Sequence, residues 1–134
     1  MIYIIKIMFK KLKEILLLSS ILLILDGITL NILSNFFNKQ IIQIQGSPIK
    51  MNIIAAIACY VFITILLYYF IVSKARSVKE AFLLGFLSYG IYELTTKALL
   101  KGWKWSTVVV DTTWGGVLFA LTTLIFYKMK KIVL

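Results

Sequence analysis

The sequence contains no histidine, one cysteine and one proline, and only 5 of its 134 residues are acidic. Without histidine, it lacks the commonest transition-metal ligand and the commonest acid–base group at neutral pH. The lone Cys59 cannot form a disulfide, a zinc site or a redox pair within one chain. We therefore expect no metal site and no cofactor, and any proton chemistry must use carboxylates, lysines or tyrosines.

Apolar residues are abundant instead. They make up 61% of the chain and give it a mean hydropathy of +0.97, so too little polar surface remains for a soluble domain. A membrane-spanning helix needs about 20 mostly apolar residues. Four runs meet this requirement: residues 15–36, 52–72, 81–100 and 106–127. The sequence therefore predicts an all-α integral membrane four-helix bundle, a single domain over residues 1–134 embedded in a lipid bilayer.

The segments around these runs carry further expectations. Residues 37–51 hold the turn signal Gly46-Ser47-Pro48, so we expect a long loop there that can lie on the membrane surface. Residues 1–7 are too apolar for a solvated tail and are expected to extend the first span at the interface. Five aromatic residues near span ends are expected to form an aromatic belt: Tyr68, Tyr69, Trp103, Trp105 and Tyr127.

The net charge of +10 comes from basic residues that stand in short clusters between the apolar runs. This placement is typical of the topology rule for membrane loops and not of a nucleic-acid surface, so we expect no nucleic-acid partner. One side of the membrane would carry ten of them: Lys6, Lys10, Lys11, Lys13, Lys74, Arg76, Lys79, Lys128, Lys130 and Lys131. The other side would carry five, which predicts that both termini are cytoplasmic.

Two of the acidic residues have ordinary structural explanations. Glu14 follows Lys10 by four residues, a spacing that brings two side chains together on one helical face. Ser77 and Glu80 have the capping-box spacing, in which the hydroxyl and the carboxylate satisfy free amides at the start of a helix. Neither acid requires a function.

The other three acids, Asp26, Glu93 and Asp111, lie inside the predicted spans. An ionised side chain there costs about 2.5–3.5 kcal/mol and marks a functional site by default. Each acid shares a helical face with other polar residues, and by helical rise all three fall in the outer half of the bilayer. We expect them to converge on one interior site walled by Thr29, Tyr89, Tyr92, Trp114 and Gly115.

Lys97 follows Glu93 by four residues, which suits an ion pair within the site. The alternative is that this lysine reaches outward to the membrane interface. Even with the pair formed, two negative charges remain, so we expect Asp26 or Asp111 to be protonated, to share a proton or to bind a cation. The structural alternative is that the acids only hold the helices together through hydrogen bonds.

Several elements of the sequence resemble a family of small four-span membrane proteins, domain of unknown function 2177. They are Asp26, Tyr89-Gly90-Ile91-Tyr92-Glu93-Leu94-Thr95, Lys101-Gly102-Trp103 and Val110-Asp111-Thr112-Thr113-Trp114-Gly115. The closest element is the aspartate, two residues, Trp-Gly pattern of the last span. The family usually has Tyr-Asp-Leu-Thr-Asn in the third span, where this chain has Glu93 and Thr96, and a tryptophan at the position of Thr29. The resemblance implies membrane placement and the three acidic positions, and it implies no activity.

Three functions fit these residues. In the first, Asp26 and Asp111 bind a proton or cation in transport or permeation, and Glu93 with Lys97 forms a gate. Four helices are few for one conduit, so this function implies a homodimer. In the second, the carboxylates act on or bind a lipid-like molecule in an apolar pocket, although no nucleophile–base pair identifies catalytic residues and the balance is against an enzyme. In the third, the chain is an accessory or assembly subunit.

Overall fold

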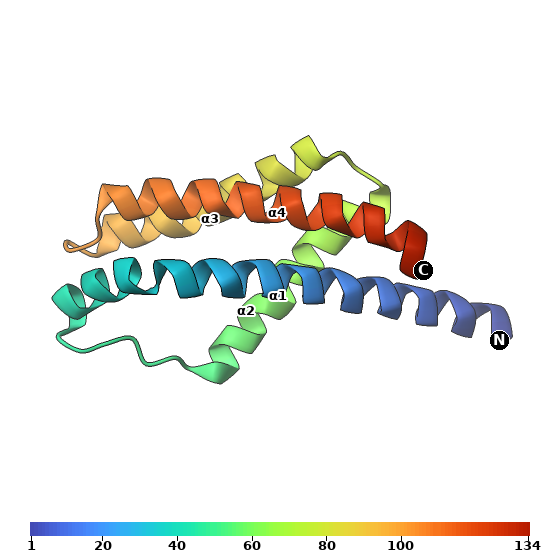
Figure 1. Ribbon diagram of the computed structural model, residues 1–134, viewed down its shortest axis with the longest axis horizontal. Coiled ribbons are helices and arrows are strands. Elements are labelled where there is room, and N and C mark those ends of the chain that lie inside the picture. Colours follow the sequence, from blue (N-terminus) through green and yellow to red (C-terminus); the bar gives the residue numbers. More distant parts are fainter.

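The computed structural model describes residues 1–134 as four α-helices without strands. The helices are α1 (Ile2–Gln45), α2 (Ile53–Phe70), α3 (Val78–Leu99) and α4 (Trp105–Val133), and a short 3-10 helix, η1 (Val72–Lys74), follows α2. In Figure 1, α1, α3 and α4 run along the long axis, α2 crosses obliquely, and both termini lie at the same end. The predicted all-α fold is confirmed.

Three helical segments are long and apolar enough to cross a membrane: Ile2–Gln45, Ile53–Lys74 and Trp105–Val133. The helix α3 is not among them because Glu93, Lys97 and other polar residues lower its hydropathy. Its 22 residues nevertheless span about 33 Å by helical rise, which exceeds the hydrocarbon thickness of about 30 Å. Its most extensive packing is against α4, so a neighbouring helix shields its polar face.

The first helix is longer than the sequence predicts. We expected a loop over residues 37–51, but α1 continues to Gln45 and only residues 46–52 are non-helical. No proline or glycine interrupts the segment between Gly27 and Gly46. The helix stops at Gly46, which adopts φ 76° and donates its N–H to the Ile42 carbonyl. Residues 2–7 extend the first span as helix, as expected.

Helices α3 and α4 approach closely because glycines line their contact. A Cβ on Gly85 would collide with the Gly115 carbonyl oxygen, and a Cβ on Gly115 would collide with the Tyr89 side chain. Leu118, Phe119 and Phe126 of α4 belong to a buried cluster that also contains residues of α1, α2 and α3. The close contact fixes the position of α3 relative to α4.

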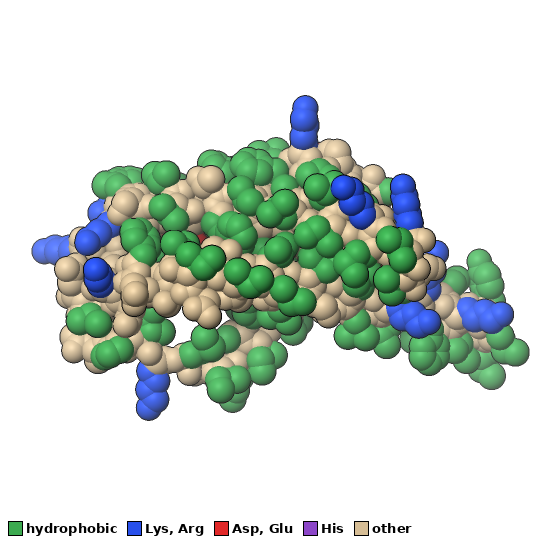
Figure 2. Space-filling view, in the orientation of Figure 1, with side chains coloured by type: hydrophobic (Ala, Val, Ile, Leu, Met, Phe, Trp, Pro, Cys, Tyr) green, Lys and Arg blue, Asp and Glu red, His purple; other side chains and the backbone are tan.

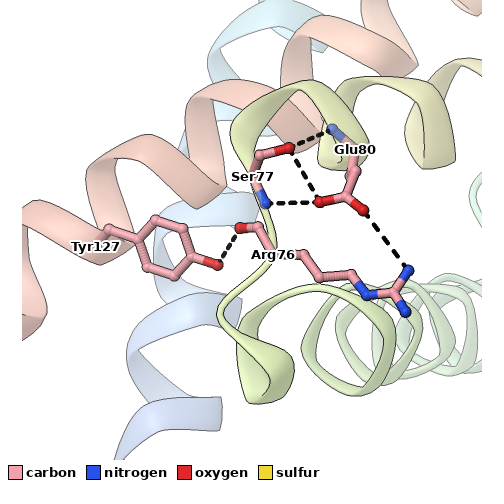
Figure 3. A network of polar contacts seen from close by, with 4 residues as sticks. All are labelled: Arg76, Ser77, Glu80 and Tyr127. Atoms are coloured by element: carbon pink, nitrogen blue, oxygen red, sulfur yellow. Dashed lines mark hydrogen bonds and ion pairs between the residues drawn. The ribbon is translucent and has the colours of Figure 1, made fainter.

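The predicted capping box at the start of α3 is confirmed (Figure 3). The Ser77 hydroxyl accepts the Glu80 N–H at 3.2 Å, and the Glu80 carboxylate accepts the Ser77 N–H at 2.9 Å. That backbone hydrogen bond is the main reason why the pKa of the Glu80 carboxyl lies below its ordinary value. The Tyr127 hydroxyl donates to the Arg76 carbonyl at 2.6 Å, which ties α4 to the turn before α3.

Glu14 does not form the predicted pair with Lys10. The Glu14 carboxylate is buried and accepts hydrogen bonds from Lys130 Nζ at 3.0 Å and from the Tyr68 hydroxyl at 3.0 Å. The prediction was wrong because helical spacing considers only residues of α1, whereas the buried face of α1 meets α2 and α4. Glu14 therefore joins three helices.

Candidate functional site

Asp26 lies on α1 and is held by both neighbouring helices. Its Oδ2 accepts the Tyr60 hydroxyl of α2 at 2.5 Å, and its Oδ1 accepts the Trp114 indole N–H of α4 at 2.9 Å. The residue is 7% exposed. Since each carboxylate oxygen has a donor, Asp26 repeats the arrangement at Glu14: an acid of α1, a tyrosine of α2 and an N–H donor of α4.

Glu93 is the most deeply buried acid, at 1% exposure. Its carboxylate accepts the indole N–H of Trp103 at 2.7 Å. Lys97 is not paired with Glu93: its Nζ donates to the Trp103 carbonyl at 2.5 Å and lies 5.4 Å from the Trp105 ring centroid. We expected Trp103 in an aromatic belt, but it is only 7% exposed. It instead binds Glu93 through its indole N–H and Lys97 through its carbonyl oxygen.

Asp111 lies on α4, and its side chain lines the same pocket as that of Glu93. The two acids come from the helices that pack most extensively against each other, so the α3–α4 contact sets their separation. Two carboxyl groups can form a hydrogen bond only when one of them carries a proton. Glu93 and Asp111 are the two acids that line one pocket.

Glu93 and Asp111 line one open pocket of about 550 Å³ between α1, α3, α4 and the segment after α1. Its other polar walls are Ser34, Asn35 and Asn38 of α1, Tyr92 of α3 and Trp103 of the α3–α4 loop. Its apolar walls are Leu30, Phe37, Ile41, Pro48, Ile49 and Met51. The pocket thus combines a carboxyl pair with a largely apolar surround.

The residues predicted to wall the site have different roles. Tyr92 lines the pocket and is 61% exposed, whereas Tyr89 packs against Gly115 and Phe119 in the α3–α4 contact. Trp114 binds Asp26. Thr29 donates its hydroxyl to the Leu25 carbonyl of its own helix at 3.1 Å. The structure therefore brings Glu93, Asp111 and Tyr92 together in one pocket.

Asp26 is a neighbour of this pocket and not part of its wall. It lies one helical turn before Leu30 of α1, which does line the pocket. The three acids are therefore near one another, but they divide into a hydrogen-bonded Asp26 cluster and a Glu93–Asp111 pair that faces the pocket.

Sequence reasoning missed the α1 side of the pocket and the tyrosine at Asp26. Ser34 and Asn38 are four residues apart and share a helical face, but we placed Asn38 in a loop because the predicted span ended at residue 36. Continuing the helical pattern to Gly46 would have found both residues. Tyr60 lies in an almost uniformly apolar run, and nothing in its spacing indicated Asp26 as its partner.

Comparison with known families decides the classification. Residues 11–128 match the sequence profile of DUF2177, a family described as a predicted membrane protein. The chain belongs to this family. The match includes all of the pocket residues and every residue of the Asp26 cluster. Comparisons with curated proteins and with solved structures give no match for the DUF2177 chain.

The side chains present limit the chemistry of the DUF2177 pocket. No group of three or more histidine, cysteine, aspartate or glutamate side chains is placed to hold a metal ion. The polar groups that face the pocket are two carboxyls, two amides, two hydroxyls and an indole. These groups can hold a proton, accept hydrogen bonds from a cationic group or neutralise its charge.

Proposed function

We propose that Glu93 and Asp111 form an intramembrane site that binds a proton or a cation in transport or permeation. The observation that carries this proposal is that the two carboxyl groups line one pocket and that neither forms an ion pair with a basic side chain. The ion pairs of the structure are Arg76 with Glu80 and Lys130 with Glu14, and neither involves the pocket. This assignment moves the ion from Asp26 and Asp111, the pair suggested by the sequence, to Glu93 and Asp111.

The energetics of burial support a positively charged occupant. An ionised group at the centre of a membrane helix costs about 2.5–3.5 kcal/mol on insertion scales. Asp26 is hydrogen-bonded to Trp114, which follows Asp111 by three residues on α4, so ionised acids at all three positions would place three negative charges in one part of the bundle. A proton or cation between Glu93 and Asp111 removes one or more of these charges. Lys97 is not placed to do so because Trp103 holds its ammonium group.

The topology that we propose has both termini in the cytoplasm. Both ends of the chain lie at the same end of the molecule (Figure 1), and that end carries the larger number of basic residues. The function would be carried out by a homodimer, because only Thr64 and Leu67 of the 18-residue helix α2 are buried within one chain. Cross-linking in native membranes would test the dimer.

The main experiment measures ion movement in proteoliposomes. The purified full chain is reconstituted with a pH-sensitive dye inside, and proton, sodium and potassium gradients are applied in turn. We expect one of these gradients to drive a flux that Glu93→Gln and Asp111→Asn each reduce at least about tenfold, because each change removes half of the carboxyl pair. Glu80→Gln is the matched control, since this acid lies in an exposed capping box outside the pocket.

Infrared spectroscopy gives an independent test of proton binding. A protonated carboxylic acid has its own absorption band, and we expect the wild-type band at neutral pH to disappear in Asp111→Asn or Glu93→Gln while remaining in Glu80→Gln. The proposal fails if wild-type protein carries no flux under any gradient, or if both pocket variants carry the wild-type flux.

A second candidate function is the binding of a lipid-like molecule. It is favoured by the apolar wall of the same pocket, which includes Phe37, Ile41 and Met51. Under this alternative a hydrophobic molecule would copurify with the protein. Mass spectrometry of solvent extracts would detect it, and Ile41→Asn, which adds no charge to the pocket, would reduce the amount that copurifies.

A further inference from the structure

Seven lysines collect where α1 begins and α4 ends. The Lys130–Glu14 ion pair, at 3.0 Å, places the last turns of α4 beside the first turns of α1. We call this group the polybasic end: Lys6, Lys10, Lys11, Lys13, Lys128, Lys130 and Lys131. Figure 2 shows basic side chains at both ends of the long axis, with another on the upper edge, and hydrophobic side chains over the middle and the right-hand end.

The polybasic end has almost no internal compensation. Glu14 is the one acid among these lysines, and it is already satisfied by Lys130 and by the Tyr68 hydroxyl. The other six lysines form no ion pair or side-chain hydrogen bond within the chain. A concentrated positive field of this kind attracts phosphate groups.

The first turns of α1 also expose apolar residues. Lys6, Lys10 and Lys13 follow one another at helical spacing and share one face. Large apolar side chains, among them Ile5, Phe9 and Leu12, are exposed beside them. A helical segment that exposes both lysines and large apolar residues is suited to the boundary between head groups and acyl chains. This pattern favours a lipid surface over a soluble nucleic acid or protein.

The length of α1 places these lysines at the correct depth. Its 44 residues span about 66 Å by helical rise, whereas a bilayer with its head groups is about 40–45 Å thick. If the hydrocarbon boundary lies near Glu14, then Lys10, Lys11 and Lys13 lie within about 6 Å of it along the helix, inside the head-group layer. Their flexible stems let the ammonium groups reach phosphate oxygens.

We propose that the polybasic end is a binding site for the head groups of anionic phospholipids. The site lies outside the Glu93–Asp111 pocket and does not depend on the function proposed for it. Its ligands would be lipid phosphates held by several lysines of α1 and α4 at once. Binding would weaken with ionic strength because its main component is electrostatic.

The test uses spin-labelled lipids in reconstituted bilayers. Electron paramagnetic resonance measures the fraction of labelled phosphatidylglycerol and of labelled phosphatidylcholine that is motionally restricted by the protein. We expect the wild-type chain to prefer the anionic lipid, and the preference to fall in high salt. A basic residue near a membrane surface contributes about a fivefold preference, so the triple variant Lys10→Gln, Lys11→Gln, Lys13→Gln should reduce the preference by at least that factor.

The matched control is Lys39→Gln, Lys50→Gln, Lys101→Gln. It removes the same charge from the opposite end, and its lysines also form no ion pair. Circular dichroism and size-exclusion chromatography check that both variants fold. The proposal is supported if only the first variant loses the preference. It is overturned if the two variants behave alike, if wild-type protein shows no preference, or if a single-stranded RNA probe still binds the polybasic end in anionic bilayers.

Discussion

The contact between α3 and α4 is expected to tolerate no side chain at Gly85. An added Cβ would lie 2.6 Å from Cγ and 2.8 Å from Cβ of Phe119, and closer still to the Gly115 carbonyl oxygen. Carbon atoms pack at about 3.5–4.0 Å, so the helices would have to separate by roughly 1 Å. Phe119 can rotate only within a filled core, and a backbone oxygen cannot rotate away at all.

The size of the effect follows from two opposing contributions. Overpacking a core contact costs about 1–3 kcal/mol, and the involvement of backbone places Gly85→Ala toward the upper limit. Replacing glycine by alanine inside a helix returns about 1 kcal/mol. We therefore expect Gly85→Ala to lower the free energy of unfolding by about 2 kcal/mol. Gly27→Ala is the control, because nothing lies within 4 Å of a Cβ at that position of α1.

Unfolding in mixed micelles of mild detergent and dodecyl sulfate, followed by circular dichroism, would measure both variants. Gly27→Ala should be as stable as wild type or slightly more stable. Gly85→Ala should also affect function, because separating α3 from α4 moves Glu93 away from Asp111 and should reduce any flux carried by the pair. Equal stability of Gly85→Ala and Gly27→Ala would refute the close helix contact.

Two further predictions concern acids outside the pocket. Lys130→Gln should destabilise the protein by about 1–3 kcal/mol, because it removes a charged hydrogen bond from buried Glu14. Lys10→Gln is the control and should have no measurable effect on the unfolding midpoint. A larger loss of stability in Lys10→Gln than in Lys130→Gln would instead support the Lys10–Glu14 pair expected from sequence. The lowered pKa of Glu80 predicts that its capping interaction is fully present above the ordinary carboxyl pKa of 4.5 and is lost as pH falls through the lower folded-state value. Unfolding midpoints measured from neutral to acidic pH should therefore fall less steeply for Glu80→Gln than for wild type.

The helices could be predicted from sequence because their cause is local. Long apolar runs in a membrane must form helices, since the bilayer offers no other partner for backbone amides. The ends of the helices were less predictable. The helix α1 ends at Gly46, which adopts a left-handed conformation. The polar residues before Gly46, which the sequence places in a loop, remain helical. The observed helix is nine residues longer than the predicted span, and Asn38 lies in this added part, where it lines the pocket.

Glu80 and Glu14 show where prediction from local spacing succeeds and where it fails. Ser77 and Glu80 satisfy each other within one turn, so the sequence contains both partners at a recognisable spacing. Glu14 finds its partners 54 and 116 residues away, at Tyr68 and Lys130. A choice between Lys10 and Lys130 depends on which face of α1 is buried, and helical spacing alone does not determine that face.

The difference between Asp26 and the Glu93–Asp111 pair follows from how many donors each meets. All three acids have the same sequence context, a carboxylate inside an apolar run, and sequence reasoning grouped them for that reason. Asp26 meets two donors, Tyr60 and Trp114, so both of its carboxyl oxygens are satisfied within the bundle. Glu93 meets a single donor, the Trp103 indole N–H, and Asp111 lines the same pocket. A carboxyl pair with few donors gains most from a proton or cation, which is why we propose the ion site at the α3–α4 contact and a structural role for Asp26.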